Sequence, residues 1–164
     1  MIVDVAARLR AAGCVFAEDE ARLLISAARG AAELEEMIQR RVDGLPLEQV
    51  VGFAEFCGLR VLVDPRVFVP RRRSEFLVWQ AAAVTPRGGI AVDLCCGSGA
   101  LGLALAASAE LGELHLADVD PAAVRCASRN VAALGTGDCQ VCLGDLYSPL
   151  PGTLRGRVDV LLAN

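Results

Sequence analysis

The feature that most constrains the fold is a regular alternation of short apolar runs with helical segments in the part of the chain after Gly88. The runs are as short as buried strands, and the segments between them carry apolar residues at helical spacing. Strands that alternate with helices in this way form βαβ units, whose strands run parallel. We therefore predict an α/β fold with strands at 90–94, 113–118, 140–143 and 158–163 and helices at 100–108 and 121–134.

The part of the chain before residue 87 has a different character. Residues 1–43 carry apolar residues at helical spacing, and Gly44 and Pro46 are expected to end this helical region. Residues 47–69 alternate apolar with polar or small residues, which predicts a β-hairpin. Ser74 is placed to cap a helix that starts at the next residue. The expected parts are a helical region at 1–45, a hairpin with a linking helix at 46–86, and an α/β domain at 87–164.

Composition limits the classes of function. The seven cysteines lie mostly in apolar segments, which indicates reduced thiols and a cytoplasmic protein. Cys139 and Cys142 have metal-ligand spacing, but no second pair completes a site, so no metal is expected. We expect no membrane span, because no apolar run approaches ~20 residues, and no signal peptide. The net charge of −4 makes a nucleic acid an unfavourable partner.

A cofactor motif stands where the first predicted strand of the α/β domain meets the following helix. The apolar run 90–92 leads to Asp93, a turn with Gly97 and Gly99 follows, and Asp118 ends the next strand. A carboxylate directly before the turn would crowd a pyrophosphate, but it suits the ammonium and sulfonium groups of S-adenosylmethionine. Asp118 can accept hydrogen bonds from two ribose hydroxyls. Asp145 follows the third strand, where its carboxylate can meet an adenine amino group.

Other readings of the same residues stay open at this point. The three carboxylates could cap helices or lie solvated in loops, and Asn164 could be an ordinary turn residue. The glycine pattern is also found in nicotinamide-dependent dehydrogenases. His115, the single histidine, lies inside a predicted strand and is expected to pack there rather than to react.

Several segments together carry a more specific resemblance. The chain resembles the HemK/PrmC family of protein-(glutamine-N5) methyltransferases, which modify translation release factors. The segments that carry the resemblance are 46–59, Val69-Pro70-Arg71 with Ser74-Glu75, Asp93 to Gly99, Asp118, Gly144-Asp145, and Asn164, which matches the first residue of the family's Asn-Pro-Pro-Tyr motif.

The resemblance implies a Rossmann-like class I methyltransferase sheet, of which this chain has the first four strands. It implies S-adenosyl-L-methionine as cofactor, S-adenosyl-L-homocysteine as product, and a protein substrate recognised partly by the helical region at 1–45. It makes Asn164 the catalytic residue and places Asn164, Arg71 and Glu75 against the substrate. The cofactor contacts that it implies are Asp93, Cys95, Gly97, Gly99, Asp118, Val119, Asp145, Leu146 and Asn164.

The chain also departs from the family pattern. Cys95 and Cys96 stand where the family usually has Gly-Thr, and Arg72 and Arg73 replace a Pro-Glu pair, which reverses the local charge. These changes indicate a paralogue. Because the Asn-Pro-Pro-Tyr motif stops at its first residue, we expect the 164 residues alone to be inactive. The alternatives are a methyltransferase acting on an exocyclic amine of RNA or DNA, and a truncated fragment that binds cofactor without catalysis.

Overall fold

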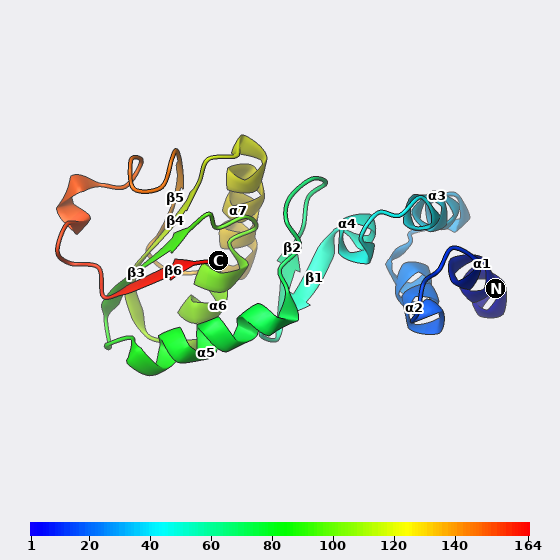
Figure 1. Cartoon of the computed structure of the whole chain (residues 1–164), viewed down its shortest axis with the longest axis horizontal. Coiled ribbons are helices and arrows are strands. Elements are labelled where there is room, and N and C mark those ends of the chain that lie inside the picture. Colours follow the sequence, from blue (N-terminus) through cyan, green and yellow to red (C-terminus); the bar gives the residue numbers. More distant parts are fainter. The chain divides into compact units, whose positions relative to one another are not determined.

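The computed structural model describes all residues from 1 to 164, which form two compact units (Figure 1). The first unit is Met1–Gly52 and the second is Phe53–Asn164. None of the helices in either unit is long and apolar enough to cross a membrane.

The first unit is a small helical cluster. Leu9, Leu24 and Ile38 come from three different helices and meet in its core. Beside this core Arg41 donates from Nε to Glu20 Oε2 at 2.7 Å, which pairs two charges that are largely buried. The helices are α1 (Ile2–Ala11), α2 (Ala17–Ala27), α3 (Ala31–Val42) and α4 (Leu47–Val51).

Three of these helices are predicted from the sequence, and α4 is not. The prediction that Pro46 closes the helical region is wrong, because Pro46 instead stands at the N-cap position of α4 with a φ of −54°. Proline fits the start of a helix, where its missing N–H has no helical partner in any case. The helix ends at Gly52, whose φ of 84° is in the left-handed region that favours glycine.

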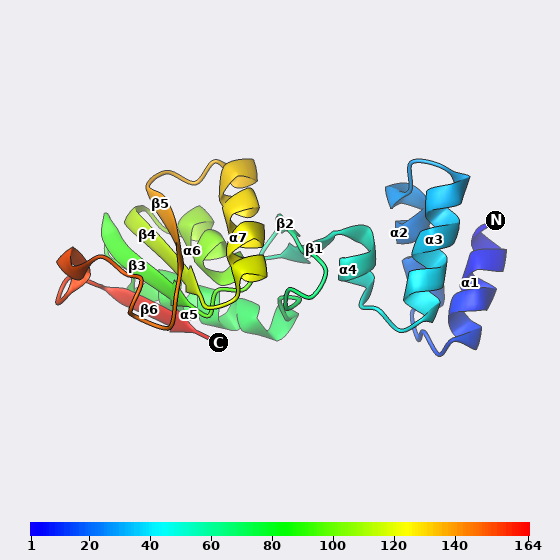
Figure 2. The ribbon, with the colours of Figure 1, turned by 90° about the horizontal axis from the view of Figure 1, so that it is seen from above.

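The second unit starts with a β-hairpin and continues with a parallel sheet. The hairpin pairs β1 (Phe53–Phe56) with β2 (Leu59–Leu62) across a two-residue turn in which Cys57 and Gly58 both have positive φ. The sheet contains β3 (Gly89–Leu94), β4 (Leu111–Asp118), β5 (Cys139–Leu143) and β6 (Val160–Ala163). The strands are all parallel and have the order β5-β4-β3-β6 (Figure 2). The predicted hairpin and parallel α/β sheet are confirmed.

The two faces of the sheet are covered differently. Helices α5 (Glu75–Val84), α6 (Ala100–Ser108) and α7 (Pro121–Leu134) pack on one face, where Leu103 and Leu116 are fully buried (Figure 1). On the other face Val92 and Leu94 pack against Leu154 of the short helix η2 (Gly152–Leu154). A second short helix, η1 (Arg72–Ser74), leads directly into α5.

A buried side chain of α7 makes several of the hydrogen bonds that fasten the hairpin to the α/β part. Asn130 of α7 is 0% exposed, accepts a hydrogen bond from Leu62 N at 2.7 Å and donates to Leu62 O at 2.9 Å. Its amide also donates to Ser98 O at 2.9 Å in the turn after β3. This single amide therefore holds the hairpin, α7 and the glycine turn together.

Register brings the ends of three strands to one edge of the sheet. Leu94 of β3 pairs with Ala117 of β4 on one side and with Ala163 of β6 on the other. Asp118 and Asn164, each one residue further along, therefore reach the same edge as the turn that follows Leu94. In parallel α/β sheets this carboxyl edge is where ligands bind.

Candidate active site

Asp93 lies near the end of β3, a strand whose six residues are all buried. Its side chain is 2% exposed, and Oδ2 accepts a hydrogen bond from the backbone N–H of Gly102 at 2.9 Å. Burial raises the pKa of the Asp93 carboxyl to about 7; the Gly102 N–H opposes this rise and the nearby charge of Asp118 adds to it. Asp93 is thus a buried carboxyl with no basic side chain paired to it, which suits it to meet a cationic ligand.

The turn after β3 depends on glycine at particular positions. Gly97 and Gly99 have φ values of 57° and 78°, and Cys95 adopts 56° although it is not glycine. At Gly102, in the first turn of α6, a Cβ atom would stand 2.4 Å from Leu116 Cδ2. The absence of a side chain there lets α6 pack closely on β4, and the turn exposes its backbone toward the edge of the sheet.

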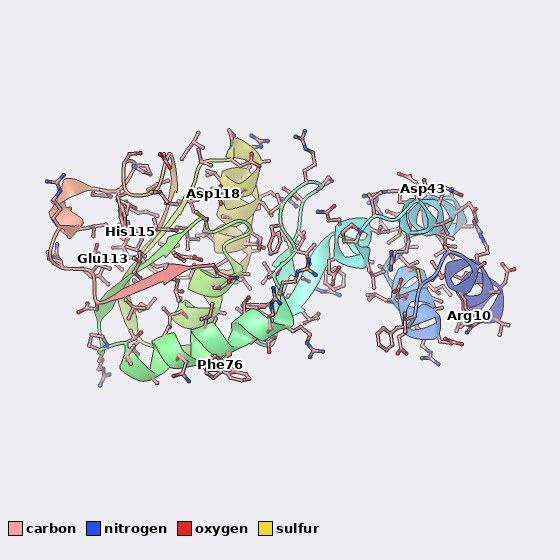
Figure 3. All side chains as sticks on the ribbon, in the orientation of Figure 1. Arg10, Asp43, Phe76, Glu113, His115 and Asp118 are labelled. Atoms are coloured by element: carbon pink, nitrogen blue, oxygen red, sulfur yellow. The ribbon has the colours of Figure 1, made fainter.

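Asp118 ends β4 and joins two loops. Its Oδ2 accepts from Gly97 N at 2.8 Å, and its Oδ1 accepts from Asp120 N at 2.9 Å. Each carboxylate oxygen can accept more than one hydrogen bond, so both keep acceptor capacity for a ligand. Figure 3 labels Asp118 on β4 together with Glu113 and His115, which stand earlier on the same strand.

A pocket of about 380 Å³ opens at this edge of the sheet. Most of its lining comes from three segments of the second unit: the loop and short helix before α5, the turn after β3 and the loop after β4. The ends of β3, β4 and β6 and the starts of α6 and α7 complete it. The lining residues are Arg66, Val67, Phe68, Pro70, Arg71, Arg73, Ser74, Asp93, Cys95, Cys96, Gly97, Ser98, Ala100, Leu101, Asp118, Asp120, Ala123 and Asn164.

Asn164 lines the pocket from the end of β6. Its Nδ2 donates a hydrogen bond to Ser74 Oγ at 2.9 Å, so its carbonyl oxygen Oδ1 remains an acceptor. Ser74 is 4% exposed and stands at the N-cap position of α5, but its side chain makes no capping hydrogen bond there. The prediction that Ser74 caps this helix is therefore right about the position and wrong about the side chain.

Of the three residues that the resemblance places against the substrate, Asn164 and Arg71 line the pocket and Glu75 does not. Arg71 lines the pocket, with its guanidinium 5.5 Å from the centre of the Phe68 ring. Glu75 lies outside the pocket lining. Its Oε1 accepts from Cys57 N at 3.0 Å, which ties the hairpin turn to the start of α5.

Four of the expected cofactor residues also lie outside the pocket lining. Gly99 packs beneath the turn, where a Cβ atom would stand 3.0 Å from Leu116 Cδ1, and the side chains of Val119, Asp145 and Leu146 are exposed. The loop that holds the last two is nevertheless close to the site, because Gly144 N donates to Asp118 O at 2.9 Å.

Among the charged and aromatic residues that line the pocket, Arg66, Phe68, Arg73 and Asp120 were not assigned to the site from the sequence. Only Asp120 carries a local signal, since an aspartate before proline is typical of a helix start. Its side chain caps α7 by accepting from Ala122 N at 2.8 Å. His115 is buried, with Nε2 3.2 Å from Glu113 Oε2, and does not line the pocket.

The chain is similar to known methyltransferases. Residues 60–164 match the methyltransferase small domain family. A release factor glutamine methyltransferase of Mycolicibacterium smegmatis is 36% identical over 135 residues, which are 81% of this chain and 47% of that protein. The release factor glutamine methyltransferase of Escherichia coli is 36% identical over 121 residues, 73% of this chain and 44% of that protein. The chain thus spans about half the length of the curated relatives that it matches.

Among solved structures, the precorrin 8W decarboxylase of Methanobacterium thermoautotrophicum superposes with a TM-score of 0.50 and 24% identity. The superposition covers 63% of this chain and 54% of that one, and it supports the fold alone. The resemblance found in the sequence motifs is confirmed by the match with the release factor enzymes. With 105 consecutive residues matched, from 60 to 164, the chain belongs to the methyltransferase small domain family.

Proposed function

We propose that the chain binds S-adenosyl-L-methionine in the pocket and transfers its methyl group to the side-chain amide nitrogen of a glutamine in a protein. Translation release factors are the proposed substrates, because the relatives described above carry that substrate in their names. The observation that carries the proposal is the Asn164 carboxamide. It lines the same pocket as Asp93 and Asp118, and its amino group is held by Ser74.

The acidic side of the pocket fits this cofactor better than it fits a dinucleotide. Asp93 is buried and unpaired, so a positively charged ligand group nearby is favoured and a pyrophosphate is disfavoured. Asp118 keeps acceptor capacity on both oxygens, which suits the two hydroxyls of a ribose. Both observations support S-adenosylmethionine over a nicotinamide cofactor.

Asn164 can orient the amide nitrogen of a glutamine side chain for methyl transfer. An amide nitrogen is a weak nucleophile because its lone pair is delocalised into the carbonyl. The free Oδ1 of Asn164 would accept a hydrogen bond from one of its N–H groups and orient the nitrogen. When bound, S-adenosylmethionine supplies an electrophilic methyl group and leaves as S-adenosyl-L-homocysteine. The surplus proton on nitrogen passes to water, so no strong base is required.

The proposed setting is the cytoplasm, with a protein as the partner. All seven cysteines are free thiols, which supports a reducing compartment. A release factor acts there during translation, so the enzyme and its proposed substrate would meet.

The proposal is tested with a form of the protein that continues beyond Asn164 through the rest of the Asn-Pro-Pro-Tyr motif and the remaining strands. This form is incubated with S-adenosylmethionine and a peptide that contains a single glutamine. Mass spectrometry is expected to find one added methyl group on that glutamine, and none on a matched peptide with asparagine in its place. The Asn164→Ala variant is expected to lose transfer while it still binds S-adenosylhomocysteine within about threefold of the unchanged protein. Equal methylation of both peptides, or full activity of Asn164→Ala, would contradict the proposal.

A further inference from the structure

The side chain of Asn130 bonds to backbone groups of two segments that lie far apart in the chain. It is 0% exposed. Its Oδ1 accepts from Leu62 N at 2.7 Å, and its Nδ2 donates to Leu62 O and to Ser98 O, each at 2.9 Å. A carboxamide has one acceptor oxygen and two N–H groups, so both of its N–H groups are used. Asn130 thus joins the end of β2 to the turn after β3.

Both of these segments lead into the pocket, although Asn130 itself does not line it. Ser98 lines the pocket directly, within the turn after β3. Leu62 ends β2, and the chain that follows it lines the pocket from Arg66 to Phe68. Asn130 is therefore placed to act on a ligand only through the two segments that it joins.

Two neighbouring side chains of α7 hold the segment after β2 as well. Cys126 Sγ donates to Leu62 O at 3.3 Å, and Arg129 pairs with Asp64. Of these three side chains of α7, only that of Asn130 also bonds to the turn after β3. The link between the two segments through α7 therefore depends on the Asn130 carboxamide.

The turn after β3 contains a backbone conformation that needs such support. Cys95 has a φ of 56° although it is not glycine. A residue with a side chain is strained in this region, and it stays there only where surrounding contacts fix it. Two contacts that fix the turn are the bond from Gly97 N to Asp118 Oδ2 and the bond from Asn130 to Ser98 O.

The carboxamide has no substitute at Ser98. Leu62 O keeps the thiol of Cys126 as a second donor, but Asn130 is the only protein donor to Ser98 O. Ser98 is 2% exposed, so the loss of this bond leaves a buried carbonyl without a partner. A carboxylate of the same shape as asparagine would still accept from Leu62 N, but it could not donate to Ser98 O.

We infer that Asn130 is a positioning residue for the methyl donor. It holds the turn after β3 and the segment after β2 in the arrangement that the cofactor requires, so that the free protein is already arranged for binding. Without it the turn samples other conformations, and the apparent affinity falls because only the ordered fraction is competent to bind. This inference rests on the proposed function and adds a residue outside the pocket that sets the affinity for its cofactor.

The experiment compares Asn130→Asp with the control Cys126→Ala on the full chain. The control also changes a buried side chain of α7 that bonds to Leu62 O, but it leaves the bond to Ser98 O in place. Urea denaturation gives the free energy of unfolding of each protein. Calorimetry of the folded proteins gives the Kd for S-adenosylhomocysteine at pH 6 and at pH 8.

We expect Asn130→Asp to bind S-adenosylhomocysteine about tenfold more weakly than the unchanged protein at pH 8, as the loss of one buried hydrogen bond allows. At pH 6 the difference should fall to about threefold, because burial keeps the introduced carboxyl protonated and a protonated carboxyl can donate once. Cys126→Ala should stay within about twofold of the unchanged protein at both pH values, even if it loses as much stability. A purely structural role of Asn130 would give both variants the same affinity.

Hydrogen exchange of the ligand-free proteins tests the inference without the cofactor. In the turn, Gly97 N donates to Asp118 Oδ2 and Gly99 N donates to Cys96 O, each at 2.8 Å. At pH 8 both N–H groups should exchange about tenfold faster in Asn130→Asp than in the control, after correction for global stability. If Asn130→Asp does not fold, Asn130→Ser takes its place, since its hydroxyl is too short to bridge the two segments.

The inference would be overturned if the Asn130 variant bound S-adenosylhomocysteine as tightly as Cys126→Ala at pH 8, or if the turn amides exchanged equally fast in both. Failure of the unchanged protein to bind S-adenosylhomocysteine would count against the proposed function instead. The exchange rates of the turn would then still decide whether Asn130 holds it.

Discussion

Asp93 is expected to couple cofactor affinity to pH. Its carboxyl is buried near the end of β3, and its pKa is raised to about 7, mainly by loss of contact with water. In the ligand-free protein it is therefore about half protonated at neutral pH. A ligand with a cationic group beside Asp93 binds better to the ionised form, so its affinity should rise with pH.

The size of the effect follows from the pKa. With a pKa of about 7, the ionised fraction of Asp93 increases from about one tenth at pH 6 to about nine tenths at pH 8. Because the apparent Kd varies inversely with the fraction of binding-competent protein, the affinity should increase about tenfold over this range.

Stability should change in the opposite direction. In the unfolded chain the Asp93 pKa is near its ordinary value of 3.8, so between about pH 4 and pH 7 the folded protein holds a proton that the unfolded chain has lost. The contribution of Asp93 to the free energy of unfolding therefore falls across this interval, by up to roughly 4 kcal/mol, and is constant above it.

Calorimetry with S-adenosylhomocysteine at pH 6, 7 and 8 tests this coupling, and Asp93→Asn is the matched variant. Asparagine keeps an oxygen for the Gly102 N–H but cannot ionise, so its affinity should be nearly independent of pH. In urea denaturation the variant should gain stability relative to the unchanged protein at pH 8 and gain less at pH 5. The reasoning would be refuted if the affinity of the unchanged protein for S-adenosylhomocysteine did not depend on pH, or if the affinity of Asp93→Asn depended on pH to the same extent.

Three further substitutions test other parts of the site. Asp118→Ala should weaken S-adenosylhomocysteine binding by more than about tenfold in calorimetry, because it removes the carboxylate that also accepts hydrogen bonds from Gly97 N and Asp120 N. An unchanged affinity would show that Asp118 does not bind the cofactor. Gly102→Ala should lower the free energy of unfolding by about 1–3 kcal/mol, because its methyl group would stand 2.4 Å from Leu116 Cδ2. The control Gly137→Ala should leave this free energy nearly unchanged, because no atom lies within 4 Å of the added methyl group. In the form that continues beyond Asn164, Ser74→Ala should lower kcat for the glutamine peptide by about tenfold with little change in KM, because Asn164 loses the partner of its amide. Ser74→Thr should restore kcat, and a change in KM alone would contradict a positioning role.

The arrangement of strands and helices in the second unit was largely predictable from the sequence. Apolar runs such as 90–94 are fully buried strands, and the glycine turn follows directly, so local pattern and tertiary position agree. The helix α4 was missed because Pro46 can either end one helix or begin another, and the sequence pattern alone does not separate these roles.

The site residues at the ends of strands were also predictable from the sequence, but the positions of the site residues in loops were not. Asp93, Asp118 and Asn164 each lie at or directly after the carboxyl end of a parallel strand, and strand register alone brings such positions together. Asp145 lies in a turn, where the direction of a side chain depends on local backbone angles such as the φ of 46° at Leu146. The bond between Ser74 and Asn164 joins residues 90 positions apart, and no local pattern signals it.

The most direct test of this interpretation is a calorimetric titration of the chain with S-adenosylhomocysteine, followed by the same titration with NAD. We predict one binding event per chain with S-adenosylhomocysteine, lost in Asp118→Ala, and no measurable binding of NAD. Binding of NAD through Asp118 without binding of S-adenosylhomocysteine would contradict the assignment of this pocket to a methyl donor.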